Sequence, residues 1–90
     1  MSGAARNRLD GKVGIVTGAG LGMGAATARV MAGYGARVVV ADINVAAGEE
    51  TVTTIRAAGG LAHFVACNVT DEEQVKALVA ETVATFGKLD

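Results

Sequence analysis

The sequence predicts an α/β fold built on a doubly wound parallel sheet. Short apolar runs at residues 12–17, 37–42 and 61–67 alternate along the chain with longer segments of helical character. Apolar residues follow one another within each run, which is typical of parallel strands covered by helices on both faces. Right-handed crossovers then place the strands side by side in the order three, two, one.

Turn residues bound the expected strands. Asp10-Gly11 precedes the first strand, and a cluster of glycines follows it. The third strand contains His63, which we expect to be a satisfied or edge-facing strand residue and not a catalytic base, because no partner carboxylate is evident. At the other end of the chain, Leu89 and Asp90 are expected to enter a fourth strand.

The first two helices are predicted from their ends. Residues 23–34 are rich in alanine and stop before Gly35, a residue type that commonly caps the carboxyl end of a helix. Asn44 is a good N-cap for the second helix, which closes at Gly59 and Gly60. The apolar residues of this second helix that lie near one face are Val45, Val52 and Ile55.

The third helix has the clearest pattern. Thr70 and Glu73 have the spacing of a capping box, in which each side chain satisfies a backbone N–H group of the other residue. Gly87 is expected to end the helix. The apolar residues that recur between them at helical spacing are Val75, Leu78, Val79, Val83 and Phe86.

The composition argues against several classes of function. The formal net charge of -1 is mixed along the chain and aromatic residues make up 3%, so no surface for nucleic acid or an anionic membrane is expected. The single cysteine, Cys67, is expected to be a buried strand thiol without a redox role. The acidic pairs Glu49-Glu50 and Glu72-Glu73 have no His or Cys at ligand spacing, so no metal site is predicted.

Residues 1–8 are polar and are expected to form a flexible tail. This tail lacks the apolar segment of a secretory signal. No stretch of about 20 apolar residues, the length that spans a membrane, occurs anywhere in the chain. We therefore expect a cytoplasmic protein without a membrane partner.

The turn after the first strand carries the main functional signal. Each glycine costs roughly 0.5–1 kcal/mol of folding free energy relative to alanine, so a turn dense in glycine needs a physical reason. Without Cβ atoms, backbone N–H groups can approach the pyrophosphate of a dinucleotide at the positive end of the following helix. A tight strand-to-helix turn is the alternative, and the generic dinucleotide spacing also fits Gly20, Gly22 and Ala25. The predicted cofactor-binding residues of this turn are Thr17, Gly18, Gly20, Leu21, Gly22, Met23 and Gly24.

Asp42 ends the second strand, 18 positions after Gly24 (42 minus 24). A carboxylate there can accept hydrogen bonds from both hydroxyl groups of the adenosine ribose, and it repels the 2′-phosphate of NADP. The sequence therefore predicts NAD in preference to NADP. Leu21 and Ile43 support this prediction, because they stand where a phosphate-binding Arg or Lys would otherwise lie. The alternative is that Asp42 only finishes a strand and opens a turn.

These residues give the chain a resemblance to the classical short-chain dehydrogenases/reductases. The family motif Thr-Gly-x-x-x-Gly-x-Gly is matched by Thr17, Gly18, Gly22 and Gly24, and the family's strand-two acid is matched by Asp42. The resemblance covers nearly the whole chain. It implies a Rossmann-type fold, of which this chain would be the N-terminal part of a single NAD(P)-binding domain, truncated after about three βα units.

The resemblance also implies how adenine is held. In the family an Asp-Val pair after the third strand holds the ring, and here the pair reads Asn68-Val69. Asn68 keeps an acceptor oxygen for the adenine amino group but lacks the charge. Ile43 is expected to flank the ring as an apolar wall. The alternatives are a helix-entry turn at Asn68 and simple cover of the sheet edge by Ile43.

Members of this family transfer hydride between a nicotinamide and an alcohol or ketone, use a Tyr, a Lys, a Ser and an Asn in catalysis, and commonly form homo-oligomers. None of these catalytic residues can be placed in the chain. The only tyrosine, Tyr34, is followed four positions later by Val38 where the family has Lys, and the only serine is Ser2. The family's Asn-Asn-Ala-Gly stretch is also absent.

We therefore expect the NAD-binding half of an oxidoreductase whose full-length form acts on a small alcohol or ketone. Two alternatives stay open. The chain could be a stand-alone dinucleotide-binding module without turnover. It could also be a non-functional fragment, in which the first strand is left as an exposed sheet edge.

Overall fold

The computed structural model describes residues 9–18 and 22–90. The predicted tail 1–8 and the turn residues Gly20 and Leu21 lie outside the described residues. The elements in chain order are β1 (Val13–Thr17), α2 (Gly22–Gly33), β2 (Arg37–Asp42), α3 (Val45–Ala57), β3 (Leu61–Ala66) and α4 (Glu72–Phe86). The predicted alternation of strands and helices is confirmed.

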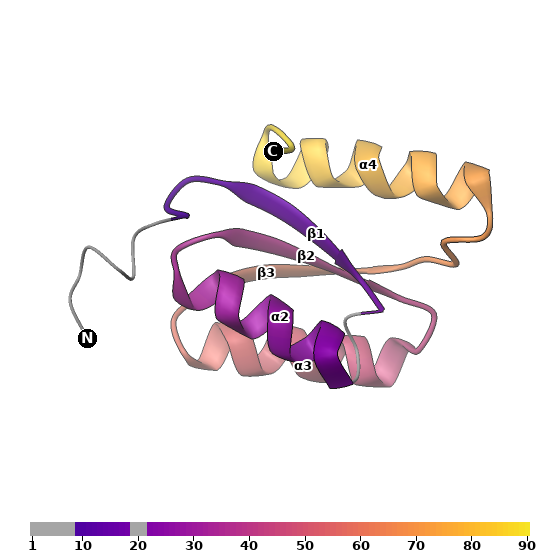
Figure 1. Cartoon of the computed structure of the whole chain (residues 1–90). Helices are drawn as coiled ribbons and strands as arrows, with labels where there is room; N and C mark the ends of the chain where they lie inside the picture. Colours follow the sequence, from indigo (N-terminus) through magenta and orange to yellow (C-terminus); the bar gives the residue numbers. More distant parts are fainter. Residues whose placement is uncertain (1–8, 19–21) are drawn as a thin grey trace.

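The strands form one parallel sheet in the order β1-β2-β3, as the right-handed crossovers predict. The central strand β2 pairs with both neighbours, and Arg37 at its start is in register with Val13 of β1 and Leu61 of β3. Helices α2 and α3 cover one face of the sheet, and α4 covers the other (Figure 1). The sheet is therefore the middle of three layers, which confirms the doubly wound α/β arrangement.

Side chains of β2 alternate between two buried clusters, because successive residues of a strand point to opposite faces. Val38 and Val40 are fully buried toward α2 and α3, and Val39 and Ala41 are fully buried toward α4. The first cluster also contains Ala28, Ala36, Val52, Ile55 and Ala62, and the second contains Cys67 and Leu78. Burial on both faces explains the continuous apolar run, and the predicted burial of Cys67 is confirmed.

Three of the predicted helix caps are present. Asn44 is the N-cap of α3, and its side-chain oxygen accepts a hydrogen bond from the Ala47 N–H at 3.0 Å. Gly35 and Gly87 follow α2 and α4 with φ angles of 96° and 84°. Residues with a Cβ atom rarely adopt this left-handed conformation, so glycine is required to end both helices in this way.

The predicted N-cap of α4 is wrong by one residue. Asp71, and not Thr70, is the cap, and its carboxylate accepts hydrogen bonds from the N–H groups of Glu73 at 3.0 Å and Gln74 at 3.3 Å. The Thr70 hydroxyl instead donates to the side-chain oxygen of Asn68 at 2.7 Å. Asp caps a helix at least as well as Thr does. Here Thr70 is used in the turn that leaves β3, so the cap moves to the next residue.

The predicted fourth strand is not formed within the described residues, but Asp90 lies beside β1. Its N–H donates to the Val13 carbonyl at 2.9 Å, and its carboxylate accepts a hydrogen bond from the Val13 N–H at 2.8 Å. The Lys88 ammonium lies 3.1 Å from the same carboxylate. The hydrogen bond from Val13, followed by that from Lys88, lowers the pKa of Asp90 below its ordinary value.

Gly48 of α3 is buried against the ring of Phe64 in β3, and a Cβ atom at Gly48 would overlap that ring. We expect Gly48→Ala to lower the free energy of unfolding by about 1–3 kcal/mol, because overpacking outweighs the better helix propensity of alanine. Gly33→Ala in α2 is the matched control, since its Cβ would have nothing within 4 Å. Urea unfolding followed by circular dichroism compares the two variants. Equal stability of Gly48→Ala and the wild type would contradict this packing.

The lowered pKa of Asp90 predicts a contribution to stability that depends on pH. The ordinary pKa is 3.8 and the folded-state pKa is lower, so the ionised carboxylate stabilises the fold above 3.8 and this contribution is lost as the pH falls through the folded-state pKa. Asp90→Asn should therefore be less stable than the wild type near neutral pH, and the two should converge in acid. Urea midpoints from about pH 7 to about pH 2 measure the difference. A difference that stays constant over this range would show that the carboxylate charge has no such role.

Candidate functional site

The ends of the strands bring the predicted site residues to one edge of the sheet. Thr17 ends β1 in register with Ala41, and Asp42 ends β2 in register with Ala66 of β3. Parallel strands all end at the same edge, which is where ligands bind in open α/β sheets. We call this region the carboxyl edge, and its described residues are 17–18, 22–24, 42–45 and 68–69.

The described part of the glycine turn has a conformation that favours glycine. Gly18 and Gly22 have φ angles of 61° and 57°, and among residues 9–18 and 22–90 a Cβ atom added at either residue would meet nothing within 4 Å. A ligand can therefore approach the backbone closely there. The turn leads into α2, whose first turn has no acidic side chain to offset the positive end of the helix dipole. Both features fit a bound phosphate group.

Asp42 is half-buried at the end of β2 and is held on two sides. Its carbonyl oxygen accepts a hydrogen bond from the Cys67 N–H at 3.1 Å, which continues the pairing of β2 with β3. Its side-chain Oδ1 accepts a hydrogen bond from the Asn44 N–H at 2.9 Å. The predicted alternative, that Asp42 opens a turn, is thus present, and the same turn fixes the carboxylate at the carboxyl edge.

Asn68 forms a helix-entry turn, which the sequence offered as the alternative to a contact with adenine. Its side-chain oxygen accepts hydrogen bonds from the Thr70 N–H at 3.0 Å and from the Thr70 hydroxyl at 2.7 Å. Its own N–H donates to Oε1 of Gln74 at 2.8 Å. The acceptor oxygen of Asn68 is therefore already used in shaping the turn between β3 and α4, two residues after the end of β3.

Large apolar side chains are exposed along the carboxyl edge. Met23 is 86% exposed, Ile43 69%, Val69 52% and Val45 48%. They come from the segments that follow three neighbouring strands, and exposed apolar surface rimmed by polar groups often marks a binding site. Met23, Ile43 and Val69 were predicted to contact the cofactor, whereas Val45 was predicted to lie on the apolar face of its helix.

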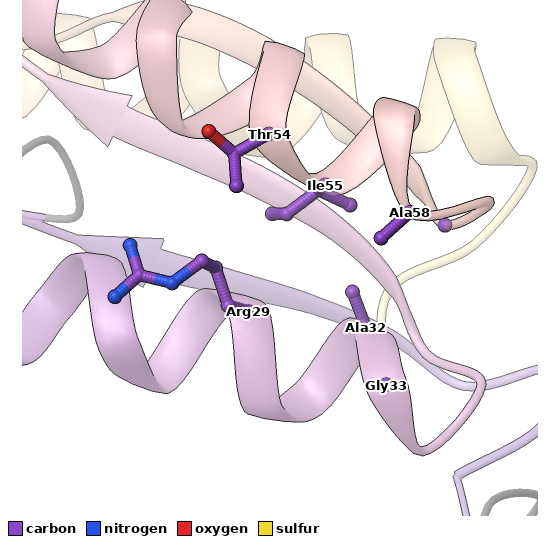
Figure 2. A pocket seen from close by; sticks show the side chains of 7 residues that line it. Arg29, Ala32, Gly33, Thr54, Ile55 and Ala58 are labelled. Atoms are coloured by element: carbon purple, nitrogen blue, oxygen red, sulfur yellow. The ribbon is translucent and has the colours of Figure 1, made fainter.

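The described residues of α2 and α3 line hollows at both ends of the helix pair. One is lined by the carboxyl-terminal halves of both helices, and Figure 2 shows Arg29 and Ala32 of α2 facing Thr54 and Ile55 of α3 across it. Helices that cross over between parallel strands run back along them, so this hollow is at the opposite end from the carboxyl edge. The second hollow lies between the amino-terminal halves and includes Gly22. It therefore adjoins the glycine turn.

His63 is a satisfied strand residue, as predicted, but the expectation that it lacks a partner carboxylate is wrong. Its Nε2 lies 2.6 Å from Oε2 of Glu81 in α4. The two residues are 18 positions apart, so no local sequence pattern indicated the pair. His63 is in the middle of β3, away from the carboxyl edge, and the pair joins α4 to the sheet.

Within residues 9–18 and 22–90, no helix has the length and apolar character needed to cross a membrane. In the same ranges no group of three or more His, Cys, Asp or Glu side chains could hold a metal ion. The acidic pair Glu72 and Glu73 lies at the start of α4, where both carboxylates are exposed near the Lys76 ammonium.

A parallel sheet between two layers of helices, with a glycine turn after β1 and an acid at the end of β2, defines a Rossmann-type doubly wound α/β protein. The comparison with protein families refines this class. The family described as short chain dehydrogenase matches residues 12–90. This chain belongs to the short-chain dehydrogenase family, whose members are oxidoreductases.

Individual relatives agree with this assignment. The 2,5-dichloro-2,5-cyclohexadiene-1,4-diol dehydrogenase of Sphingobium indicum is 52% identical over 82 residues, which are 91% of this chain and 32% of that protein. The structure of a hydroxysteroid dehydrogenase from Escherichia coli superposes with a TM-score of 0.91 at 42% identity, covering 96% of this chain and 35% of that one.

A putative D-mannonate oxidoreductase from Haemophilus influenza, solved with bound NAD, gives a TM-score of 0.89 at 30% identity over 97% of this chain and 31% of its own. The chain spans about a third of the length of the relatives it matches.

Proposed function

We propose that this chain is the NAD-binding part of a short-chain dehydrogenase/reductase that transfers hydride between NAD(H) and an alcohol or ketone. The observation that supports the proposal is the register of β1 and β2, in which Thr17, where the glycine turn begins, lies opposite Ala41, the residue before Asp42. In this family of folds a pyrophosphate lies on the first turn and a ribose lies against the acid of the second strand. Hydride transfer is the chemistry that a nicotinamide supplies when bound.

The residues of the glycine turn would hold the pyrophosphate. The open space beyond Gly18 and Gly22 admits phosphate oxygens to the backbone, and the amino end of α2 offers its N–H groups and the positive end of its dipole. Thr17, Gly20, Leu21, Met23 and Gly24 belong to the same proposed contact surface. Exposed Met23 extends the apolar surface next to the turn.

The segments after β2 and β3 would hold the adenosine. The Asp42 carboxylate would accept hydrogen bonds from both ribose hydroxyl groups and would repel a 2′-phosphate, so NAD is proposed in preference to NADP. Ile43 and Val69 offer exposed apolar surface for the two sides of the adenine ring. The N–H and the hydroxyl group of Thr70 already occupy both acceptor positions of the Asn68 side-chain oxygen. For Asn68 to accept a hydrogen bond from the adenine amino group, the Thr70 hydroxyl would therefore have to give up its bond to that oxygen. The NAD bound to the putative D-mannonate oxidoreductase supports the choice of a nicotinamide cofactor.

Membership of the family also supports proposals for the substrate and for the oligomeric state. The relatives are named for oxidation of a cyclohexadiene diol and a hydroxysteroid, which are both alcohols. A small-molecule alcohol or ketone substrate and a homo-oligomeric assembly are therefore proposed for the protein that carries this segment. The 90 residues hold no Tyr-x-x-x-Lys pair, so no proton transfer is assigned to them.

Gly22→Ala tests the pyrophosphate contact. The added Cβ strains a φ of 57° in the turn that is proposed to hold the pyrophosphate, so we expect NADH and NADPH to lose affinity together, each by about tenfold. Gly59→Ala is the matched control, because its φ is 90° and its Cβ would also meet nothing within 4 Å, but it lies in the turn before β3. Fluorescence titration with each cofactor measures the affinity, and circular dichroism verifies the fold. A folded wild-type chain that binds neither cofactor would refute the proposed function.

Asp42→Ala tests the choice of cofactor. Loss of the carboxylate removes charge-assisted hydrogen bonds to the ribose, each contributing about 1.5–3 kcal/mol, and also removes the repulsion of a 2′-phosphate. We expect NADH binding to weaken by at least about tenfold while NADPH binding changes little or improves. The same titration measures both dissociation constants. Equal loss of affinity for the two cofactors would rule out Asp42 as the residue that selects NAD.

A further inference from the structure

We propose that Asn44 is a positioning residue for cofactor choice: it holds the Asp42 carboxylate in the orientation that favours NADH over NADPH. This inference rests on the proposed function, because it assumes that Asp42 faces the adenosine ribose. The new element is that the choice between NADH and NADPH depends on a second residue. The backbone N–H of Asn44 contacts Asp42, and the side chain of Asn44 is fixed by helix α3. Asn44 does not need to touch the cofactor to act in this way.

The contact between the two residues is direct. The Asn44 N–H donates to Oδ1 of Asp42 at 2.9 Å, which closes a short ring over the residue between them. The main chain of Asp42 is fixed separately, because its carbonyl oxygen accepts the Cys67 N–H at 3.1 Å. With the backbone of Asp42 held by the sheet, the hydrogen bond from the Asn44 N–H is a contact that helps to orient its carboxylate.

Helix α3 in turn fixes Asn44. The side-chain oxygen of Asn44 accepts the Ala47 N–H at 3.0 Å, and its carbonyl oxygen accepts the Gly48 N–H at 3.0 Å. These bonds hold Asn44 in the extended conformation of an N-cap, with φ of -83° and ψ of 96°. The helix itself is anchored in the core by Val52 and Ile55, which are both buried. The orientation of the carboxylate is thereby coupled to a packed element.

A carboxylate with a fixed orientation distinguishes NADH from NADPH better than a mobile one does. To accept hydrogen bonds from both ribose hydroxyl groups, the two carboxylate oxygens must face the ribose together. A carboxylate that is already oriented in this way loses little entropy on binding NADH. Repulsion of a 2′-phosphate also needs the charge to stay at that position. If the cap of α3 is lost, the Asn44 N–H is no longer held toward Oδ1 and both effects weaken. NADH then binds more weakly, and the ratio of the NADPH to the NADH dissociation constant falls.

The test measures the ratio of the NADPH to the NADH dissociation constant in variants of the purified chain, each verified as folded by circular dichroism. Asn44→Ala removes the capping oxygen and keeps the backbone N–H, and we expect it to lower the ratio by about twofold to tenfold. Asn44→Ser supplies another good capping oxygen and should restore the ratio. Asp42→Asn provides the reference loss of selectivity.

Asp71→Ala is the matched control for loss of a helix cap. Asp71 is the N-cap of α4 on the other face of the sheet, so the variant should lower the thermal midpoint much as Asn44→Ala does. Through Gln74 it can disturb Asn68. Adenine is common to both cofactors, so that disturbance changes both dissociation constants together. The ratio should therefore equal that of the wild type.

The outcomes separate this inference from the function on which it rests. A lowered ratio in Asn44→Ala, restored in Asn44→Ser and absent in Asp71→Ala, supports the positioning role. A lowered ratio in Asp42→Asn with an unchanged ratio in Asn44→Ala overturns that role and leaves the proposed NAD preference in place. An unchanged ratio in Asp42→Asn overturns the NAD preference and the inference with it. Failure of Asn44→Ser to restore the ratio also overturns the role, because the capping oxygen would then not be the cause.

Discussion

The parallel register of β1, β2 and β3 is the constraint on which the candidate site depends. Thr17 lies opposite Ala41, so the glycine turn and Asp42 leave neighbouring strands at the same level. A shift of β2 by one residue would turn Val38 and Val40 to the α4 face and would move Asp42 away from the turn. Burial of β2 on both faces strongly disfavours such a shift. The same packing that stabilises the fold therefore sets the geometry of the carboxyl edge.

The helices do more than cover the sheet, because their ends shape the edge. The amino end of α2 continues the glycine turn, and α3 begins at Asn44, whose N–H contacts the Asp42 carboxylate. The close approach of α3 to the sheet depends on Gly48 beneath the Phe64 ring. Packing in the α2/α3 layer and orientation of side chains at the carboxyl edge are thus parts of one structure.

The two outer strands are protected in different ways. Asp90 pairs with β1 through its main chain and side chain. On β3, the hydrogen bond from Cys67 to Asp42 shows that odd-numbered residues face β2, so the carbonyl of Ala62 faces outward. Arg56 of α3 donates to that carbonyl from Nε at 3.0 Å and from Nη2 at 2.8 Å. A carbonyl occupied by two donors is a poor acceptor for a strand of another molecule.

The sequence by itself determined the element order, the parallel sheet and the location of the glycine turn and Asp42, because these follow from local residue types and from the rule that crossovers are right-handed. Only the tertiary structure decided that Asp71 caps α4 in place of Thr70, and that His63 meets Glu81. These contacts depend on how the chain leaves β3 and on the angle at which α4 crosses the sheet. The angle of α4 is set by packing between segments distant in sequence, which no local pattern encodes. The shift of the cap follows from the turn in which the Thr70 hydroxyl bonds to Asn68.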